Sequence, residues 1–472
     1  MRGNPLVQAF DRLVSKQPTR ALVLSPGRRA TAEQVDALAR AAARPLEVLP
    51  PGAIIGLLAP NGPAFLASLL ALARAGATAV LFDHRTPSVE RCRVARDIGA
   101  YAFLSCAKGW PDGPEDWRLE AFPEALPATR SIAPGGVIKL TSGTTGSARG
   151  IAASAEALLA DDAALIRTMG IAAEDRLLAN IPFSHSYGLS SLVIPCLVRG
   201  LPLIVPESGG PFGPISAAQR LEATVFPTVP AFLSALTRLA DPPPTPPTLR
   251  LVLSAGALLR ADTAGRFRER FGQPVHVFYG SSESGGITYD REGGGAERGT
   301  VGTPVEGARV ELEELTEDSS CGAGRVIVRS PAVADTYLPM ADPRLADGCF
   351  RTQDLGRWNR HGELLLVSRL DDIINVRGKK VNPREVQRVL TDHPAIEEVE
   401  VLAIRCPERQ EPVIRAVIAC PPGSLSRREV LDWCRGRLAD HKRPRSVVLL
   451  DRLPRTPRGK VDRAALGRLI SA

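Results

Sequence analysis

The segment from Lys139 to Gly150 is rich in Gly, Ser and Thr, the residue types that best suit anion binding in this chain. The segment reads Lys-Leu-Thr-Ser-Gly-Thr-Thr-Gly-Ser-Ala-Arg-Gly. Glycine lets backbone N–H groups approach an anion closely, and Thr and Ser hydroxyls add donors that can rotate. Such a loop can cradle a polyphosphate. It lacks the Gly-Lys-[Ser/Thr] ending of the common NTPase P-loop, and a plain Ser/Thr/Gly turn is the alternative.

The order of these residues resembles the phosphate loop of the acyl-adenylate-forming superfamily. That superfamily contains acyl- and aryl-CoA synthetases, adenylation domains of peptide synthetases, and luciferases. In it the loop usually ends in Lys-Gly, often after Pro, whereas this chain has Ala148-Arg149. Arg keeps the charge but adds a bidentate fork, so we expect activity with altered phosphate contact. The resemblance implies that Thr144 is also catalytic and that ATP or AMP is bound by Thr141, Ser142, Gly143, Thr144, Thr145, Gly146 and Arg149.

The segment 277–283, Val-Phe-Tyr-Gly-Ser-Ser-Glu, resembles the Tyr-Gly-x-[Thr/Ser]-Glu motif of the same superfamily. The resemblance implies that Tyr279 stacks on adenine and that Ser282 contacts the α-phosphate. Glu283 is then the catalytic carboxylate that binds Mg²⁺, a hard cation that prefers oxygen ligands. Open α/β sheets bind ligands at the carboxyl ends of their strands, which supports this assignment. The alternative interpretation is a turn at the end of a strand, with Glu283 exposed to solvent. Four further residues are assigned to the nucleotide site: Gly280, Ser281, Gly256 and Ala257, the last two as the floor of the adenine pocket.

The segment 181–189, Ile-Pro-Phe-Ser-His-Ser-Tyr-Gly-Leu, resembles the motif beside the acyl pocket. His185 would line the path of the substrate carboxylate, although it could be an ordinary loop histidine. Peptide-synthetase domains for α-amino acids carry an Asp here, and its absence from 182–189 argues against such substrates. Tyr187, Gly285 and Gly286 complete the predicted pocket. Two adjacent glycines leave room for a medium-to-long acyl or bulky aryl acid, unless they only form a permissive turn.

The segment 351–356, Arg-Thr-Gln-Asp-Leu-Gly, resembles the Thr-x-Asp-[Leu/Val]-Gly motif. Its Asp354 carboxylate can accept both ribose hydroxyls, and an Asx-turn aspartate is the alternative. The segment 368–381 is a second strong match to the superfamily, after the phosphate loop. It implies that Arg369 reaches the ribose or phosphate and that Asp371 is the hinge between two domains.

Three residues after the hinge are assigned to the thiol tunnel of CoA-forming relatives. The resemblance places Gly378 in the loop that lines the tunnel, with Lys379 and Lys380 near the phosphates of the thiol donor. A solvated basic turn is the plainer reading of the two lysines. Near the end, Pro-Arg-Thr-Pro-Arg-Gly-Lys at 454–460 resembles the C-terminal catalytic motif, and a basic tail is the alternative. One ammonium, that of Lys460, can bridge the substrate carboxylate and the α-phosphate.

Helical and strand-like patterns alternate around these motifs, which predicts an α/β fold of parallel sheets with flanking helices. Helices are predicted at 63–74 and 87–98. After residue 300 the sequence pattern changes to short strands separated by turns, with no long helix between them. This indicates a small antiparallel β subdomain at about 300–367. Strands are predicted at 54–58, 78–82, 101–104, 137–140, 176–181, 203–205, 224–226, 251–253, 275–278, 310–315, 325–329 and 363–367.

A chain of 472 residues is longer than one hydrophobic core usually serves, so at least two domains are expected. We predict a large ATP- and acyl-binding domain at 1–370. A small, mobile α+β lid would occupy 371–472, with elements in the order strand-helix-strand-strand-helix-strand.

Composition narrows the class of protein. Hydrophobic residues make up 44% and charged residues 23%, as in globular enzymes. The net charge is +8, but no basic run is interleaved with aromatic residues, so nucleic-acid binding is not predicted. A mildly positive electrostatic field would suit anionic substrates such as ATP or coenzyme A. The eight cysteines form no Cys-x-x-Cys pair, so zinc is not expected. No secretory leader or membrane span is recognised, which favours a cytoplasmic protein with reduced thiols.

The sequence therefore predicts an ATP-dependent, AMP-forming carboxylic acid:CoA ligase that uses Mg²⁺ and acts on a fatty or aryl acid. A stand-alone enzyme that loads a carrier-protein phosphopantetheine is the nearest alternative. A non-catalytic binding protein on the same scaffold would require loss of Lys460 or Asp354, and both are present. A monomer or homodimer is expected.

Overall fold

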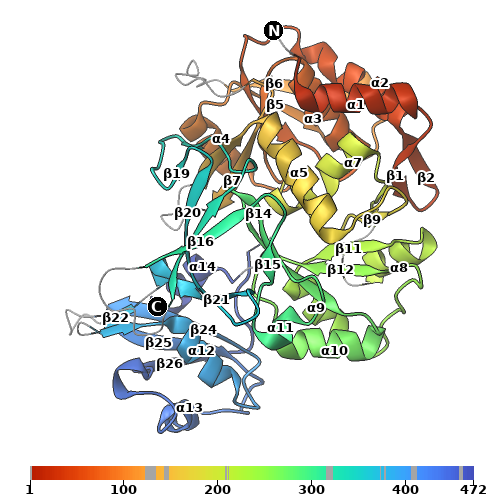
Figure 1. The fold of residues 1–472 in the computed structure, drawn as a ribbon. Helices are drawn as coiled ribbons and strands as arrows, with labels where there is room; N and C mark the ends of the chain where they lie inside the picture. Colours follow the sequence, from red (N-terminus) through yellow and green to blue (C-terminus); the bar gives the residue numbers. More distant parts are fainter. Residues whose placement is uncertain are drawn as a thin grey trace. The chain divides into compact units, whose positions relative to one another are not determined.

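The structure is a computed structural model, and it divides the chain into two compact units (Figure 1). It describes residues 3–122, 134–142, 148–207, 210, 212–314, 323–372, 374–376, 379–405, 412–456 and 461–471. The first unit comprises residues 1–311, 327–352 and 358–365, and the second comprises 312–326, 353–357 and 366–472. The chain thus has a large N-terminal part and a smaller C-terminal part, while the boundary at 370 and 371 stays a prediction.

A seven-stranded sheet with the order β18-β8-β7-β4-β3-β5-β6 carries the start of the predicted phosphate loop. Its centre is parallel, as predicted: β5, β3, β4 and β7 run in one direction. The prediction was incomplete at the edges, where β6, β8 and β18 pair antiparallel. The strands are β3 (Ile54–Leu58), β4 (Thr78–Leu81), β5 (Ala102–Cys106), β6 (Trp117–Ala121), β7 (Val137–Ser142), β8 (Ala148–Ala153) and β18 (Thr336–Leu338).

A nine-stranded sheet with the order β15-β14-β13-β12-β11-β9-β10-β1-β2 carries the other predicted motifs. Its central strands, from β13 to β1, are parallel. The outer strands β2, β14 and β15 pair antiparallel. The strands are β1 (Ala21–Ser25), β2 (Arg28–Thr31), β9 (Leu177–Leu178), β10 (Leu203–Ile204), β11 (Val225–Thr228), β12 (Leu251–Ser254), β13 (Val275–Ser281), β14 (Gly285–Tyr289) and β15 (Thr303–Pro304).

Helices of the first unit connect and cover these sheets (Figure 1). The helix α5 shows why they form where they do. Ser154 caps its start by accepting from the N–H of Ala157, and Gly170 ends it in the left-handed conformation. The helices are α1 (Pro5–Lys16), α2 (Ala32–Ala43), α3 (Pro63–Arg74), α4 (Ser88–Ile98), α5 (Ala155–Met169), α6 (Ser186–Gly188), α7 (Ile194–Arg199), α8 (Phe212–Arg220), α9 (Pro230–Thr237), α10 (Ala261–Phe271) and α11 (Gly295–Arg298).

The short strands predicted between 300 and 367 are present. They form a sheet with the order β16-β17-β20-β19, in which β21 also pairs with β20. The strands are β16 (Arg309–Glu313), β17 (Gly324–Arg329), β19 (Leu345–Ala346), β20 (Cys349–Trp358) and β21 (Leu364–Arg369).

The C-terminal segment is α+β, as predicted, and ends in a helix that the sequence analysis missed. β22 and β23 form a hairpin, and β24, β25 and β26 form a three-stranded sheet. The elements are β22 (Ile374–Val376), β23 (Lys379–Val381), α12 (Pro383–Thr391), β24 (Glu398–Arg405), β25 (Pro412–Ala419), α13 (Arg427–Cys434), β26 (Ser446–Leu450) and α14 (Arg463–Ser471). This segment has its own apolar core, which includes Val386, Val401, Ile414 and Val430.

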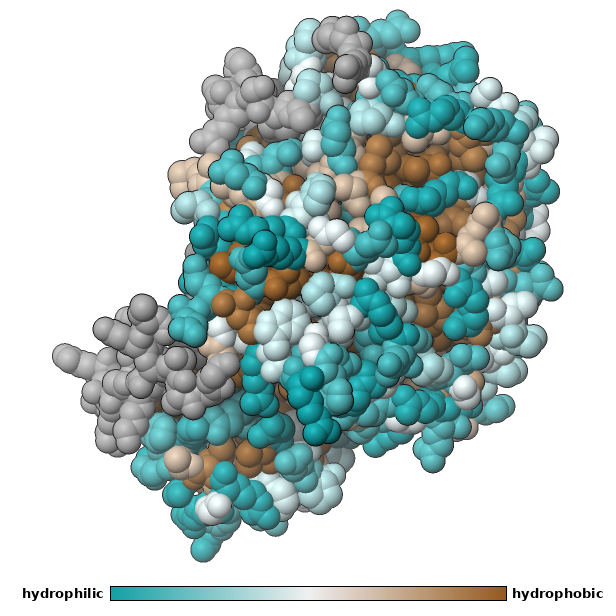
Figure 2. Space-filling model, viewed as in Figure 1, coloured by the Kyte–Doolittle hydropathy of each residue, from teal (hydrophilic) through white to brown (hydrophobic). Residues whose placement is uncertain are grey.

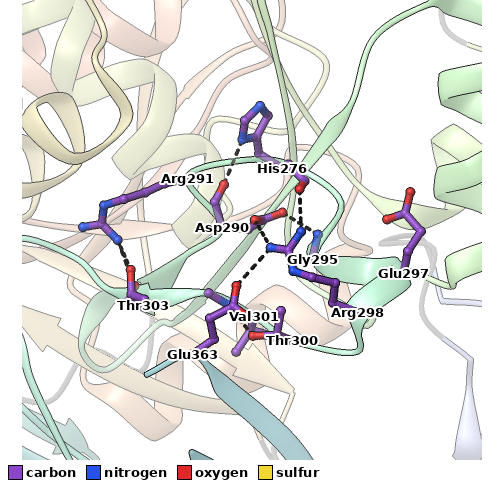
Figure 3. A network of polar contacts seen from close by, with 12 residues as sticks. His276, Asp290, Arg291, Gly295, Glu297, Arg298, Thr300, Val301, Thr303 and Glu363 are labelled. Atoms are coloured by element: carbon purple, nitrogen blue, oxygen red, sulfur yellow. Dashed lines mark hydrogen bonds and ion pairs between the residues drawn. The ribbon is translucent and has the colours of Figure 1, made fainter. Parts of the chain in front are cut away.

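A polar network supports β13 and β14 from the side (Figure 3). Asp290, which follows β14, is 1% exposed and pairs with Arg298 at 2.9 Å. Arg298 also pairs with Glu363 at 2.9 Å, and His276 of β13 shares a hydrogen bond of 2.8 Å with the carbonyl oxygen of Asp290. The network therefore joins β13, the end of β14, α11 and the start of β21 around one buried carboxylate.

The face shown in Figure 2 exposes hydrophobic residues in separate areas with hydrophilic residues between them. No helix in the described part of the chain is both long and apolar enough to cross a membrane. Among the described residues, the large hydrophobic side chains that are exposed are Val48, Val89, Tyr101, Phe212, Leu258, Met340, Trp358 and Leu469.

Candidate active site

Two of the predicted nucleotide-binding segments lie at the ends of neighbouring parallel strands. The register pairs Ser254 of β12 with Val277 of β13, so both strands end at the same edge of the sheet. Gly256, with φ of +83°, turns the chain sharply after β12, and both it and Ala257 are exposed. Tyr279 is half-buried and Gly280 is exposed. The structure thus places segments 254–257 and 279–283 at the edge where open α/β sheets bind ligands.

Glu283 is held by both its backbone and its side chain. Its carbonyl oxygen accepts from the N–H of Ala334 at 2.7 Å. Its Oε1 accepts from the hydroxyl of Tyr337, on β18, at 2.9 Å. Burial, together with the charge of Glu283, raises the pKa of Tyr337 well above its ordinary value, so the phenol stays a donor. The carboxylate therefore has a fixed direction.

Arg149, which stands where the superfamily usually has Lys, lies against the same tyrosine. Its guanidinium carbon is 5.1 Å from the centre of the Tyr337 ring, a cation–π distance. Its Nη1 pairs with Asp342 at 3.2 Å, and Asp342 also pairs with Arg344 at 2.6 Å. Hydrogen bonds from Arg344 hold the pKa of Asp342 below its ordinary value, so this carboxylate stays charged. Arg149 and Glu283 therefore share one tyrosine.

The predicted acyl motif meets the Glu283 motif through two serines. The hydroxyl of Ser186 lies 2.6 Å from that of Ser282. His185 is half-buried and caps the short helix α6, where its Nδ1 accepts from the N–H of Tyr187 at 3.2 Å. Tyr187 is 7% exposed and its hydroxyl donates to the carbonyl oxygen of Leu253 at 3.3 Å. The structure brings these two motifs together through this contact.

The two glycines of the predicted acyl pocket are buried, and their missing side chains make room for other residues. A Cβ on Gly285 would lie 2.4 Å from Oδ1 of Asp161. A Cβ on Gly286 would lie 2.7 Å from Cδ2 of Leu165 and 3.2 Å from a ring carbon of Phe278. The absent side chains therefore do not by themselves enlarge a pocket, and the size of the acyl substrate stays a prediction.

The predicted ribose-binding residues lie together in the second unit. Nε of Arg369, at the end of β21, is 3.8 Å from Oδ1 of Asp354 on β20. Asp371 lies in a short 3-10 helix, Leu370–Asp372. Lys379 and Lys380 begin β23 and pair with Val376 and Asn375 of β22.

Several predicted site residues lie outside the described part of the chain. The description of β7 and β8 leaves out the residues between Ser142 and Ala148, and covers only the backbone of those two. The predicted residues that fall outside are Gly143, Thr144, Thr145, Gly146, Gly378 and Lys460.

Sequence reasoning missed three residues that contact the site. Lys139 was treated as part of an apolar strand, although a Lys in such a run is itself a signal because lysines are rarely buried without a partner. Asp161 stands in the apolar helix α5 and carries the same kind of signal. Tyr337 gave none, since its contact with Glu283 spans 54 residues of sequence.

The carboxylate of Glu283 fits a magnesium ion that also binds the phosphates of a nucleotide. Mg²⁺ is usually held by one or two carboxylates together with substrate phosphates, rather than by a cage of protein ligands. The described residues contain no group of three or more His, Cys, Asp or Glu side chains able to hold a metal.

Comparison with known proteins decides the family. Residues 10–338 match the family described as "AMP-binding enzyme", and residues 385–460 match the "AMP-binding enzyme C-terminal domain". The chain belongs to the AMP-binding enzyme family. This confirms the family resemblance predicted from the motifs.

Relatives within the AMP-binding enzyme family include CoA ligases. Indoleacetate–CoA ligase of Aromatoleum aromaticum is 27% identical, over 99% of this chain and 98% of the relative. Feruloyl-CoA synthase of an Amycolatopsis species is 29% identical, over 89% of both chains. The predicted likeness to acyl- and aryl-CoA ligases is thereby confirmed.

The fold of this AMP-binding enzyme also matches solved structures. The o-succinylbenzoate CoA synthetase of Bacillus subtilis, in complex with its acyl-adenylate, has a TM-score of 0.82 with 97% of each chain covered and 23% identity. The ATP-bound MatB of Rhodopseudomonas palustris has a TM-score of 0.81 with 98% of each chain covered and 21% identity. These similarities show the fold, and the α/β architecture predicted from the sequence is confirmed.

Proposed function

We propose that this protein is an AMP-forming carboxylic acid:CoA ligase that consumes ATP. The observation that carries the proposal is that Glu283, which follows β13, and Arg149 of β8 both lie against Tyr337. Next to Glu283, the hydroxyl of Ser282 meets that of Ser186 in the predicted acyl motif. Full-length similarity to CoA ligases for aryl and fatty acids supports it.

In the first half-reaction the substrate carboxylate attacks the α-phosphorus of ATP, and pyrophosphate leaves. Catalysis here is mainly positioning and charge stabilisation. We assign adenine to Tyr279 and the pocket floor at Gly256 and Ala257, the α-phosphate to Ser282, and the ribose to Asp354 and Arg369. The loop from Thr141 to Arg149 would bind the phosphates.

Two positive charges, the ammonium of Lys460 and a magnesium ion, would offset negative charge as the carboxylate approaches. Lys460 would bridge the carboxylate and the α-phosphate. Glu283 would hold a magnesium ion, which supplies positive charge to the phosphate oxygens when it is bound.

In the second half-reaction the thiol of coenzyme A attacks the acyl-adenylate, and AMP leaves. We assign the thiol path to the loop around Gly378, with Lys379 and Lys380 near the phosphates of the donor and Asp371 as the hinge. Exchange of Lys460 for the Gly378 loop would let one pocket serve both reactions.

The test is a screen of ATP–pyrophosphate exchange with aryl, fatty and amino acids, including indoleacetate, ferulate and long-chain fatty acids. Acids that support exchange are then supplied with coenzyme A or with a holo carrier protein, and the thioester is detected by mass spectrometry. We expect exchange with an aryl or fatty acid and a CoA thioester as product. A protein that exchanges with no acid, or that transfers only to carrier protein, contradicts the proposal.

A further inference from the structure

A buried lysine lies beneath the turn that carries Glu283. Lys139 stands on β7, two residues before Thr141, and is 2% exposed. Its Nζ donates to the carbonyl oxygen of Ser282 at 3.1 Å. The strand that leads into the predicted phosphate loop is therefore tied to the residue directly before Glu283.

A buried aspartate holds the other end of the same turn. Asp161 of α5 is 3% exposed, and its Oδ1 accepts from the N–H of Gly286 at 2.9 Å. Its Oδ2 has no hydrogen-bond partner in the part of the chain that the structure describes. The carboxylate lies so close to Gly285 that a Cβ there would be 2.4 Å away. Residues 282–286 are thus held at both ends by charged side chains.

The two charges favour each other, but they are costly to bury. Burial lowers the pKa of Lys139 and raises that of Asp161, and the charge of each opposes the shift of the other. Glu283 adds a further attraction to the Lys139 ammonium. Buried ion pairs can often be replaced by apolar residues without loss of stability. Stability alone therefore gives little reason for these two residues to be charged.

We propose that Lys139 and Asp161 are positioning residues that hold the 282–286 turn so that Glu283 meets the magnesium–ATP complex correctly. This inference rests on the proposed function and adds two residues that themselves touch no substrate. Residues that orient a metal ligand typically change metal affinity or activity by about 10–100-fold when they are replaced. The same range is expected here.

A buried ion pair on the same helix, α5, supplies a matched control. Asp162 is 1% exposed and pairs with Nη2 of Arg199 at 2.7 Å. It follows Asp161 directly on the helix, and its Oδ2 is bonded by Arg199 on α7 rather than by the 282–286 turn. Removing this pair reports the cost of losing a buried ion pair without disturbing the support of Glu283.

The experiment compares the Lys139→Met/Asp161→Leu double variant with the Asp162→Leu/Arg199→Met double variant. Removing both partners together avoids an unpaired buried charge, which would be destabilising. Asp161→Asn is the conservative variant, since its amide oxygen can still accept from Gly286. Melting temperature, the exchange kcat, the KM for the acid, and the Mg²⁺ concentration for half-maximal exchange are measured.

For Lys139→Met/Asp161→Leu we expect the half-maximal Mg²⁺ concentration to rise and kcat to fall, each by about tenfold or more. The KM for the acid and the melting temperature should match those of the control pair. Asp161→Asn should stay closer to the wild type in kcat and in half-maximal Mg²⁺ concentration than the Lys139→Met/Asp161→Leu double variant. A double variant whose Mg²⁺ dependence and kcat equal those of the control pair overturns the inference.

Failure of the proposed function would be seen separately. If the wild type supports exchange with no acid, the ligase proposal fails, and the same variants are compared by calorimetric titration with ATP at several Mg²⁺ concentrations. A selective loss of Mg²⁺-dependent ATP binding in the Lys139/Asp161 variant still supports the inference. Equal binding by both double variants, or no binding by the wild type, overturns it.

Discussion

The proposed metal site depends on a single hydroxyl group, that of Tyr337. It donates to Oε1 of Glu283, while the ring of the same residue carries the guanidinium of Arg149. One side chain therefore orients a predicted metal ligand through its hydroxyl and a predicted phosphate ligand through its ring. The two roles can be separated, because Phe retains the ring and loses only the hydroxyl.

Tyr337→Phe should weaken magnesium-dependent ATP binding while Arg149 keeps its place. A hydrogen bond to a charged group is worth about 1.5–3 kcal/mol, so we expect affinity to fall roughly 10–150-fold. Calorimetric titration with ATP and Mg²⁺ measures this, with Tyr101→Phe as the control at an exposed tyrosine. Unchanged affinity would mean that the direction of Glu283 does not depend on this bond.

Asp354→Ala should weaken ATP binding through loss of the ribose contact. A carboxylate that accepts both ribose hydroxyls contributes about 1.5–3 kcal/mol by the same reasoning. ADP and AMP, which keep the ribose, should lose affinity by a similar factor, and Asp241→Ala on the surface is the control. A variant with unchanged ATP affinity and turnover would remove Asp354 from the nucleotide site.

The sequence predicted best those elements whose start and end are determined by residues close by in the chain. The helix α3 spans the predicted 63–74, because Pro63 starts it and an apolar run follows. The strand β9 was predicted at 176–181 but comprises only Leu177 and Leu178, which pair with β10. The strands β14 and β18 were not predicted, and β18 pairs with β8, which is distant in sequence. Long-range pairing is also why Tyr337 was missed in the site.

The turn between β13 and β14 shows how an element can require glycine for a steric reason. Gly285 has φ of +67° and lies against Asp161, whereas Gly170 has φ of +60° with no atom within 4 Å of a Cβ there. Alanine at either position bears the left-handed strain of about 1–2 kcal/mol. Only alanine at Gly285 must also displace a buried side chain.

Gly285→Ala should therefore destabilise the protein by about 1–3 kcal/mol more than Gly170→Ala, the usual cost of overpacking a buried site. Urea denaturation of the two variants and the wild type measures the difference in free energy of unfolding. The larger loss should be accompanied by weaker Mg²⁺ activation, because the turn carries Glu283. Equal losses for the two variants would contradict the close packing of Asp161 against this turn.

At the scale of the whole molecule, the predicted residues for the two half-reactions fall in the same C-terminal segment. Lys460 is assigned to adenylation, and Gly378 to thiol transfer, while Glu283 and the loop after β7 belong to the larger part of the chain. If the C-terminal segment presents these residues in turn, each half-reaction should be separable by mutation. Two variants with opposite effects test this arrangement.

Lys460→Ala should depress adenylate formation by about 10²–10³-fold, as losing a charge-stabilising group can. Pyrophosphate exchange measures this step. Thioester formation from supplied acyl-adenylate should persist, since the ammonium is no longer needed once pyrophosphate has left. Equal damage to both steps would show that Lys460 does not act in adenylation alone.

Gly378→Leu should have the opposite effect. A leucine side chain would narrow the path of the pantetheine arm, so thioester formation should slow strongly while pyrophosphate exchange stays near the wild-type rate. Single-turnover transfer from acyl-adenylate to coenzyme A measures the step, and Gly467→Leu, at a glycine of the same segment with no atom within 4 Å of a Cβ, is the control. Loss of exchange with retained transfer would assign the loop to the other half-reaction. If neither step changes, the thiol does not enter past Gly378, and the division of labour within the C-terminal segment must lie in other residues.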